Sequence, residues 1–388
     1  MIPIRGLFGG LISGTSLDGV DAILLEVRGR DPVSVEWEVL SFLSEPYSVD
    51  ERVRIRAAIE SGGARELALI HAELGRSFSR AFRALLNQSD TDPFELTAVG
   101  LLGQTFWHEP PTPGHPGVSL QLGDATVLAE DLGCDVVSDF RSRDMAVGGH
   151  GAPLVPWSDW VLLRRPGIGR ALQNLGGIGN VTFLPADGDL NRVLGFDTGP
   201  GVALLDRAAQ LASNGADLWD LDGRRAARGT VIRGLLADLL TDEFFVKAPP
   251  RSTGRERFGD KRLEEIVERV QPASEVEWDN LLATLTELTA RSVALAYEAF
   301  LPVEAVHEVV LTGGGARNPT LVAALRRELA PLQVEVGSDA LGIDPDAREA
   351  AAFALLAWAH VHGFSGNLPA VTGAVGKRVL GALHPGRG

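Results

Sequence analysis

Three glycine-rich turns contain the residues of this chain that are best suited to binding an anion. Each follows an apolar run, and they occupy residues 13–19, 197–201 and 312–318. Glycine has no Cβ atom, so several backbone N–H groups can approach one anion, and positive φ angles cost little there. Taken singly, each turn is more typical of tight-turn geometry. Together, the three favour a nucleotide held by backbone amides.

Hydroxyl and carboxylate side chains beside these turns extend the same chemistry. Hydroxyls can donate to phosphate oxygens, and carboxylates and water are ligands that Mg²⁺ prefers. The candidates are Thr15, Ser16, Thr198, Asp18, Asp21 and Asp197. None of the three lysines in the sequence follows a glycine-rich loop, so the phosphate-loop motif G-x-x-x-x-G-K-[ST] is absent. A nucleotide site in this chain must work without that lysine.

Composition excludes several other classes of protein. The 388 residues include 36 Lys and Arg against 51 Asp and Glu, which gives a formal net charge of −15. Such an acidic surface argues against a dedicated binder of nucleic acid or of anionic membranes. The single cysteine, Cys134, excludes an intramolecular disulfide and a multi-thiolate metal site. We see no signal peptide or membrane span, and we expect a soluble, cytoplasmic protein.

The elements that must position these turns alternate between apolar runs and segments of helical period, which indicates an α/β protein. Runs 7–12 and 20–27, joined through an Asp-Gly pair, predict a β-hairpin. A second strand–turn–strand unit comprises runs 171–175 and 181–184 around Gly176 and Gly177. Because each hairpin is followed by helices and further strands, we expect two lobes of similar construction with a cleft between them.

Apolar periodicity also predicts the remaining elements of both lobes. Helices are predicted at residues 49–60, 64–87, 202–213, 278–300, 319–329 and 346–362, and strands at 98–102, 135–137, 193–196 and 306–311. We expect the first lobe to span residues 1–137 and to be completed by residues 364–388. The second lobe is expected to span residues 138–363.

Nine motifs, in order along the chain, resemble those of the anhydro-N-acetylmuramic acid kinase family. They are GTSLDGVD from Gly14, GQT from Gly103, DFRSRD from Asp139, GGHGAPLVP from Gly148, NLGGIGN from Asn174, GFDTGPG from Gly195, STGRE from Ser252, GGGARN from Gly313 and NLPAVTGA from Asn367. The resemblance implies two lobes of duplicated actin-like ATPase topology with a central nucleotide cleft. It also implies a homodimer.

The activity implied by this resemblance uses ATP, Mg²⁺ and a small amino-sugar substrate. Members of the family open the 1,6-anhydro bond of anhydro-N-acetylmuramic acid with water and phosphorylate the freed 6-hydroxyl. The product, N-acetylmuramic acid 6-phosphate, belongs to cell-wall (peptidoglycan) recycling. Mg²⁺ is expected to be held through the ATP phosphates.

Site residues are carried over from the matching motifs. Asp197 corresponds to the catalytic aspartate, and Arg143 and Glu349 fall where the family contacts the sugar. The residues expected to bind the nucleotide are Gly14, Thr15, Ser16, Leu17, Asp18, Gly19, Val20, Asp21, Gly176, Gly177, Gly313, Gly314, Gly315 and Asn318.

Each of the three chemical assignments has a structural alternative. Asp197 could take a proton from the attacking water, or it could accept backbone N–H groups within its own turn. Arg143 could hold the lactyl carboxylate of the substrate through a bidentate fork, or form a salt bridge to Asp139 or Asp144. Glu349 could orient water or a sugar hydroxyl, or be a polar helix position.

The sequence departs from the family pattern at Leu102, where His usually precedes Gly-Gln-Thr, and at His150, where Gln is common. Substrate preference or rate could therefore differ from the typical member. Two other functions remain open on the residues alone. One is a kinase of the same fold that acts on an ordinary sugar hydroxyl, and the other is a nucleotide-gated binding or chaperone-type protein. A plain glycosidase leaves the three turns unexplained.

Overall fold

The computed structural model describes residues 5–14, 17–112 and 114–387. Contacts divide the chain into two compact units: unit 1 consists of Met1–Leu162 and Asp346–Gly388, and unit 2 consists of Leu163–Pro345. The chain thus leaves unit 1 later than the expected residue 137 and returns to it earlier than residue 364. The difference arises because helix α14 (Arg348–Val361) packs on the sheet of unit 1.

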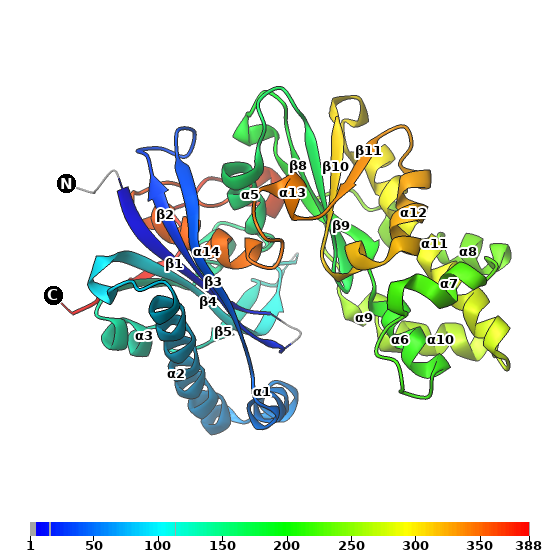
Figure 1. The fold of residues 1–388 in the computed structure, drawn as a ribbon, viewed down its shortest axis with the longest axis horizontal. Coiled ribbons are helices and arrows are strands. Elements are labelled where there is room, and N and C mark those ends of the chain that lie inside the picture. Colours follow the sequence, from blue (N-terminus) through cyan, green and yellow to red (C-terminus); the bar gives the residue numbers. More distant parts are fainter. Residues whose placement is uncertain (1–4, 15–16, 113, 388) are drawn as a thin grey trace. The chain divides into compact units, whose positions relative to one another are not determined.

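The sheet of unit 1 begins with the predicted hairpin (Figure 1). Its strands are β1 (Arg5–Ser13), β2 (Gly19–Arg28), β3 (Glu36–Pro46), β4 (Leu96–Glu109), β5 (Val118–Leu122), β6 (Asp135–Ser138) and β12 (Ala382–His384). They follow the order β12-β6-β4-β1-β2-β3, and β5 pairs with β4. Strand β2 is antiparallel to both β1 and β3, whereas β4 is parallel to β1 and β6 is parallel to β4.

Unit 2 repeats this arrangement. Its strands are β7 (Arg170–Leu175), β8 (Ile178–Leu184), β9 (Leu194–Pro200), β10 (Glu308–Thr312) and β11 (Gln333–Val336), in the order β11-β10-β7-β8-β9. Again the first three strands are antiparallel, the next is parallel to the first, and the last is parallel to its neighbour. The predicted α/β fold with duplicated topology is confirmed.

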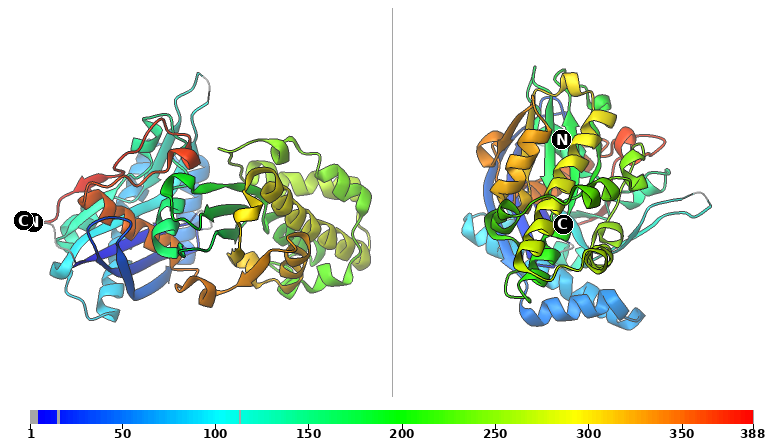
Figure 2. Two further views of the ribbon diagram at one scale, coloured as in Figure 1. Left: turned by 90° about the horizontal axis from the view of Figure 1, so that it is seen from above. Right: turned by 90° about the vertical axis from the view of Figure 1, so that its right-hand side faces the viewer.

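Helices on both faces complete unit 1. They are α1 (Val49–Ser61), α2 (Ala64–Gln88), α3 (Ala125–Leu132), α4 (Ser142–Met145), α5 (Val155–Leu163), α14 and α15 (Pro369–Thr372). The predicted apolar stripe of α2, which includes Ile70, Leu74, Phe78 and Phe82, is buried in the core. Figure 2 shows the hairpin of β4 and β5, coloured cyan to teal, projecting from the body of this unit.

Two glycines set the distance between α14 and the sheet of unit 1. A Cβ atom on Gly10 would lie 2.0 Å from the carbonyl oxygen of Ala350, and one on Gly100 would lie 2.1 Å from that of Phe353. A Cβ atom on Gly9, the next residue of β1, would instead meet Phe82 of α2. Successive strand residues point to opposite faces, so α14 and α2 cover opposite faces of the sheet.

In unit 2, the 26-residue helix α11 (Glu275–Phe300) forms the centre of the packing. The other helices are α6 (Ala203–Ala212), α7 (Arg224–Arg228), α8 (Arg233–Leu239), α9 (Arg255–Phe258), α10 (Asp260–Val270), α12 (Pro319–Glu328) and α13 (Ser338–Leu341). Helix α11 contacts β9, α6, α7, α8 and α12. Among the residues that the structure describes, no helix is both long enough and apolar enough to cross a bilayer.

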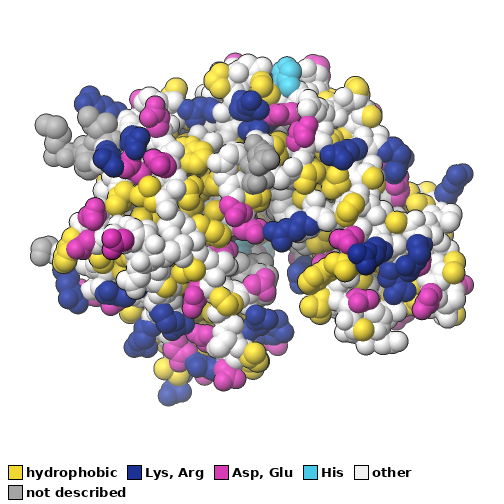
Figure 3. All heavy atoms as spheres, in the orientation of Figure 1, with side chains coloured by type: hydrophobic (Ala, Val, Ile, Leu, Met, Phe, Trp, Pro, Cys, Tyr) yellow, Lys and Arg dark blue, Asp and Glu magenta, His cyan; other side chains and the backbone are white. Residues whose placement is uncertain are grey.

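Charged side chains of both signs lie side by side on the face drawn in Figure 3. Exposed ion pairs join some of the charged side chains of the protein, such as Arg83 and Asp131, whose Nε and Oδ2 atoms are 2.6 Å apart. Exposed pairs of this kind contribute about 0–1 kcal/mol each. The stability of each unit therefore depends mainly on its apolar core.

Substituting Gly10 by Ala tests the close packing of α14. The new methyl group would collide with a backbone carbonyl that cannot rotate away, so we expect a loss of about 3 kcal/mol or more in the free energy of unfolding. Gly234→Ala in α8 is the matched control, because nothing lies within 4 Å of its added Cβ atom. Calorimetric unfolding measures both, and an unchanged Gly10→Ala variant would contradict the packing described.

Candidate active site

The first glycine-rich turn joins β1 to β2 in unit 1. Thr15 and Ser16 lie outside the described residues. The Leu17 N–H donates to the Gly14 carbonyl at 3.2 Å, and Leu17 has a φ of 60°. A Cβ atom on Gly19 would lie 2.2 Å from the Glu45 carbonyl oxygen of β3. Glycine is thus required at position 19 by the neighbouring strand, and Asp18 is exposed beside it.

A cluster of buried polar side chains packs against this turn. The sequence did not predict it. The Ser13 Oγ atom lies 2.6 Å from Gln104 Oε1 and 3.0 Å from the Gly19 carbonyl, and it accepts from the Tyr47 hydroxyl at 2.9 Å. Burial raises the pKa of Tyr47 to about 12, so its hydroxyl stays protonated. Strand β4 continues through Gly103 and Gln104, and Leu102 is buried within it rather than placed at a turn.

Carboxylates gather near the start of β2 and the start of α14. Burial raises the pKa of Asp21, and the charges of Asp346 and Asp18 raise it further, against a hydrogen bond from Ser44. Although Glu349 keeps contact with solvent, the protein around it raises its pKa, and the charge of Asp21 acts in the same direction. The structure thus brings together two predicted site residues, Asp21 and Glu349.

A buried ion pair fixes the start of α14 beside these carboxylates. Arg348 Nε donates to Asp159 Oδ1 at 2.6 Å, and Arg348 Nη2 donates to Asp159 Oδ2 at 2.5 Å. The side chains are 9% and 0% exposed, respectively. This bidentate pair joins α5 to α14 and so positions the adjacent Glu349.

Arg141, rather than the predicted Arg143, lies beside Glu349. Arg143 is exposed, and it forms no salt bridge to Asp139 or Asp144 in the described part of the chain. Arg141 Nη1 donates to the Gly151 carbonyl at 2.9 Å, and its Nε atom is buried without a partner. Burial lowers the pKa of Arg141 to about 10, and the charge of Glu349 opposes that change. Arg141 therefore has hydrogen-bonding capacity that a ligand could use.

Asp144 organises the loop that follows these arginines. Its Oδ1 atom accepts from Asn367 Nδ2 at 2.7 Å and from Thr372 Oγ1 at 2.8 Å. Its Oδ2 atom accepts from the Gly151 N–H at 2.9 Å. Asp144 is fully buried, so all three donors compensate the cost of removing its charge from water. The motifs at residues 139–156 and 367–374 thus form one structural network.

Asp197 lies in the middle of β9 in unit 2. Its Oδ2 atom accepts from the Thr253 N–H at 2.8 Å. Burial raises the pKa of Asp197 to about 7, whereas the Thr253 hydrogen bond and the Arg251 charge lower it and Glu256 raises it. Such a carboxylate can exchange a proton near neutral pH, as a general base must. Thr198, the next residue, is buried and accepts from Gln173 Nε2 at 3.1 Å.

Arg251 supports Asp197 from the interior of unit 2. Its Nε atom donates to the Asp197 carbonyl at 2.8 Å, and the Asp197 N–H donates to the Arg251 carbonyl at 3.4 Å. The guanidinium group lies 4.7–5.2 Å from the ring centroids of three phenylalanines, Phe196, Phe244 and Phe300. Sequence analysis missed this residue, although it directly precedes the STGRE motif.

The second hairpin turn connects β7 to β8 as predicted. The Gly176 carbonyl accepts from the Val202 N–H at 2.8 Å, and the Gly177 carbonyl accepts from the Gly201 N–H at 3.0 Å. A Cβ atom on Gly177 would lie 3.5 Å from the guanidinium of Arg255. An arginine side chain therefore stands next to this turn.

A pocket of about 460 Å³ in unit 2 contains three of the predicted nucleotide-binding residues, Gly314, Gly315 and Asn318. A Cβ atom on Gly313 would lie 2.4 Å from Asn174 Oδ1, and one on Gly315 would lie 2.8 Å from Leu175 and from Val202. Asn318 also caps α12, because its Oδ1 atom accepts from the Thr320 N–H at 3.0 Å. The volume lies within the range of small-molecule sites.

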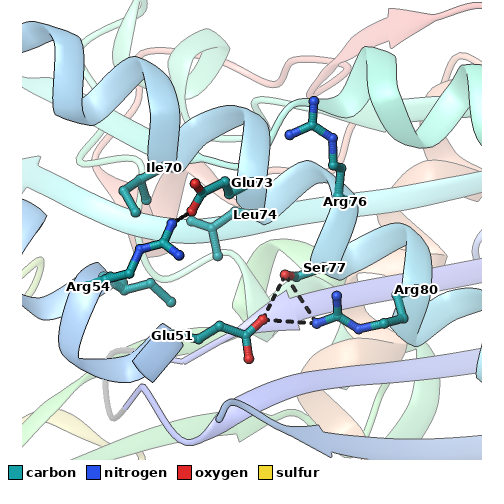
Figure 4. Close-up of a pocket in the computed structure, with 9 residues that line it drawn as sticks. Glu51, Arg54, Ile70, Glu73, Leu74, Arg76, Ser77 and Arg80 are labelled. Carbon is teal, nitrogen blue, oxygen red and sulfur yellow. Dashed lines mark hydrogen bonds and ion pairs between the residues drawn. The ribbon is translucent and has the colours of Figure 1, made fainter. Parts of the chain in front are cut away.

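A different pocket, of about 220 Å³, lies between α1 and α2 (Figure 4). Arg54 forms an ion pair with Glu73, and Arg80 Nη2 donates to Glu51 Oε1 at 2.9 Å. The charged side chains that line this pocket thus largely pair with one another, and none of the predicted site residues lines it. The pocket of unit 2 is therefore the better candidate for the nucleoside.

Removing the charge of Arg348 tests how the start of α14 is held. Arg348→Met leaves Asp159 buried without its partner, so we expect a loss of about 3–5 kcal/mol in the free energy of unfolding. Arg348→Met combined with Asp159→Leu should lose less. Arg80→Met, which removes an exposed ion pair, is the control and should cost about 1 kcal/mol or less. Urea titration measures all three, and equal losses for the single and double variants would contradict this account.

Comparison with known proteins bears on the whole chain. The family model described as "Anhydro-N-acetylmuramic acid kinase" matches residues 6–386. A relative of that name in Gloeobacter violaceus is 44% identical over 97% of this chain and 98% of its own length. One in Caldanaerobacter subterraneus is 40% identical over 96% of each chain.

One solved structure, the activator of the 2-hydroxyisocaproyl-CoA dehydratase from Clostridium difficile with bound ADPNP, is similar at 14% identity. The TM-score is 0.41, and the match covers 91% of this chain and 94% of that chain. The family model and the two relatives decide the assignment, since they extend over nearly the full length at 40% identity or more. This chain belongs to the anhydro-N-acetylmuramic acid kinase family.

Proposed function

We propose that this protein uses ATP and water to convert 1,6-anhydro-N-acetylmuramic acid into N-acetylmuramic acid 6-phosphate and ADP, a reaction of peptidoglycan recycling. Water attacks the anomeric carbon and loses a proton, and the bond from that carbon to the bridging O6 atom breaks. O6 attacks the γ-phosphorus of ATP, and ADP departs. The observation that carries the proposal is the half-buried Asp197 carboxylate in a chain of this family, with its pKa raised to about 7.

Asp197 takes the proton from the attacking water in this proposal. One of its oxygens accepts from the Thr253 N–H, so the carboxylate is fixed in direction while the other oxygen has no donor in the described part of the chain. General-base assistance of this kind gives about 10²–10⁴-fold in rate. Correct positioning of the reactants and neutralisation of the phosphates must supply the rest.

The nucleotide is proposed to bind at the glycine-rich turns and in the pocket of unit 2. Support comes from the pocket of unit 2 that includes Gly314 and Gly315, and from the glycine turns at residues 14–21 and 176–177. Mg²⁺ is proposed to be held mainly by phosphate oxygens and water, which is its usual mode with ATP, and it neutralises phosphate charge. No group of three or more His, Cys, Asp or Glu side chains in the described ranges forms a complete metal site.

The sugar is proposed to bind near the carboxylates of unit 1. Arg141, whose Nε atom is buried without a partner, is suited to hold the lactyl carboxylate of the substrate. Glu349 then faces a sugar hydroxyl or the attacking water. A contact from Arg143 to the sugar and a homodimeric assembly remain predictions.

Turnover in ¹⁸O-labelled water tests the proposal. With ATP, Mg²⁺ and the anhydro sugar, mass spectrometry should find one heavy oxygen at the anomeric hydroxyl of the product and none in its phosphate, because O6 comes from the sugar. Asp197→Asn should lower the rate about 10²–10⁴-fold. More than a tenth of wild-type turnover in that variant would exclude Asp197 as the essential base.

Controls separate this reaction from its alternatives. Unlabelled product kept in ¹⁸O-water for the same time measures exchange at the anomeric carbon. Phosphorylation of N-acetylmuramic acid but not of its anhydro form would identify a kinase for an ordinary hydroxyl. ATP hydrolysis that no sugar affects would indicate a nucleotide-gated binding protein.

The pH dependence of kcat/KM reports the state of Asp197. A general base must be deprotonated, so activity should be lost as pH falls through about 7, the pKa to which burial raises this carboxyl. Arg251→Met removes a charge that lowers this pKa and should move the acidic limb to higher pH. Glu256→Gln removes a charge that raises it and should move the limb to lower pH. Shifts of the same sign in both variants would show that another group controls the limb.

A further inference from the structure

Asp206 is a carboxylate in the wall of the unit 2 pocket that has no hydrogen-bond donor among the described residues. It lies in the first turn of α6. The two other acids of the wall are satisfied: Asp220 accepts from the N–H groups of Arg225 and Ala226, both at 2.9 Å, and Asp222 accepts from Arg224 Nη2 at 2.8 Å. Asp206 thus differs from its neighbours in its unused acceptor capacity.

Asp206 is partly withdrawn from water. Burial raises its pKa to about 6, and the charge of Arg255 lowers it, so the group is mostly ionised at neutral pH. A desolvated carboxylate without donors is unfavourable, and native structures satisfy most such groups. A ligand in the pocket that brings hydroxyl or amino donors would remove this cost.

The surroundings of Asp206 indicate which part of a nucleotide it meets. Arg255 lies next to the Gly177 turn, and its charge acts on Asp206. A cationic side chain beside a glycine turn is suited to bind phosphate. The same pocket wall includes Trp219 and Leu221, whose side chains are 53% and 55% exposed and suit the flat face of a base. A carboxylate repels phosphate, whereas the ribose between base and phosphates carries two hydroxyl donors.

We propose that Asp206 accepts hydrogen bonds from the ribose hydroxyls of the bound nucleotide and selects ribonucleotides over deoxyribonucleotides. The inference rests on the proposed use of ATP. A hydrogen bond to a charged acceptor typically changes affinity about ten- to hundredfold. Wild-type protein should therefore bind ATP more tightly, by about that factor, than 2′-deoxy-ATP or 3′-deoxy-ATP.

Binding and kinetics of the three nucleotides test the proposal. In Asp206→Ala, the affinity for ATP should fall about ten- to hundredfold, while the affinity for the deoxynucleotide lacking the bonded hydroxyl should change little. Preference for ATP should then disappear. Asp206→Asn, which keeps one acceptor oxygen, should retain part of the preference. KM should carry the change and kcat should be little affected, because the contact is the same in ground and transition states.

Asp222→Asn is the matched control, since Asp222 lies in the same wall but is already paired with Arg224. It should leave the ratio of affinities for ATP and deoxy-ATP unchanged. Two results would overturn the proposal. One is a wild-type protein that does not discriminate between ATP and the deoxynucleotides, and the other is an Asp206→Ala variant that binds all three nucleotides more weakly by the same factor, as loss of a Mg²⁺ ligand would cause.

Failure of this inference is distinguishable from failure of the proposed function. Isothermal titration calorimetry with the three nucleotides and Mg²⁺ needs no sugar turnover, so it measures the role of Asp206 by itself. Sugar phosphorylation without ribose discrimination would overturn the assignment of Asp206 alone. Ribose discrimination without sugar phosphorylation would overturn the proposed reaction and leave Asp206 as the ribose acceptor.

Discussion

The hydrogen bond from the Thr253 N–H to Asp197, 2.8 Å long, is the one donor that the described structure directs at that carboxylate. Asp144 shows the contrast, because its two oxygens accept three donors, from Asn367, Thr372 and Gly151. Both carboxylates are at least half-buried. Hydrogen-bond donors satisfy both oxygens of Asp144, whereas only one oxygen of Asp197 has a donor. A carboxylate with a full set of donors serves structure, whereas one with a free oxygen and a pKa near 7 can take a proton.

Glycines allow the backbones of neighbouring elements to come close together, and this close packing positions residues of the candidate site. In unit 1, Gly10 and Gly100 let α14 rest against β1 and β4, which fixes the position of Glu349 in the first turn of that helix. In unit 2, Gly313 allows the turn after β10 to lie against Asn174. A side chain at any of these positions would push a functional element away from its sheet. The same glycines are therefore required both for the close packing of these elements and for the positions of the residues that they carry.

Much of the fold could be predicted because its signals are local. Both hairpins, the duplicated order of elements and the long helices follow from apolar runs, glycine turns and helical periodicity. Strand β3 was not predicted, since most of its residues are exposed or half-buried and alternate weakly. In α11, Ser292 is buried because Gly199 of β9 lies against the helix there, a contact that the local sequence does not reveal.

The site was harder to predict than the fold, because its contacts are long-range. Arg141 and Arg143 stand two residues apart in one motif, and the resemblance assigned the sugar contact to Arg143. Burial distinguishes the two in the fold. Arg141 is half-buried and its charge acts on Glu349 of helix α14, whereas Arg143 is exposed. Likewise, nothing local connects Tyr47 with Ser13, or Arg251 with Asp197. Motif matching finds the segments, whereas the burial and the partners of each side chain follow only from the tertiary fold.

The supply of hydrogen-bond partners separates two of the proposed ligand-binding groups, Asp206 and Arg141, from the structural carboxylates. Asp206 accepts no hydrogen bond from the described residues, although it is half-buried and burial raises its pKa. Arg141 has the complementary property, a buried N–H without an acceptor. Folding alone would favour pairing such groups, because each unmet hydrogen bond in a desolvated position costs about 1–3 kcal/mol. The proposed ligand contacts, ribose hydroxyls at Asp206 and a substrate carboxylate at Arg141, would supply the hydrogen bonds that these two groups lack, whereas the fold itself satisfies Asp144, Asp159 and Asp220.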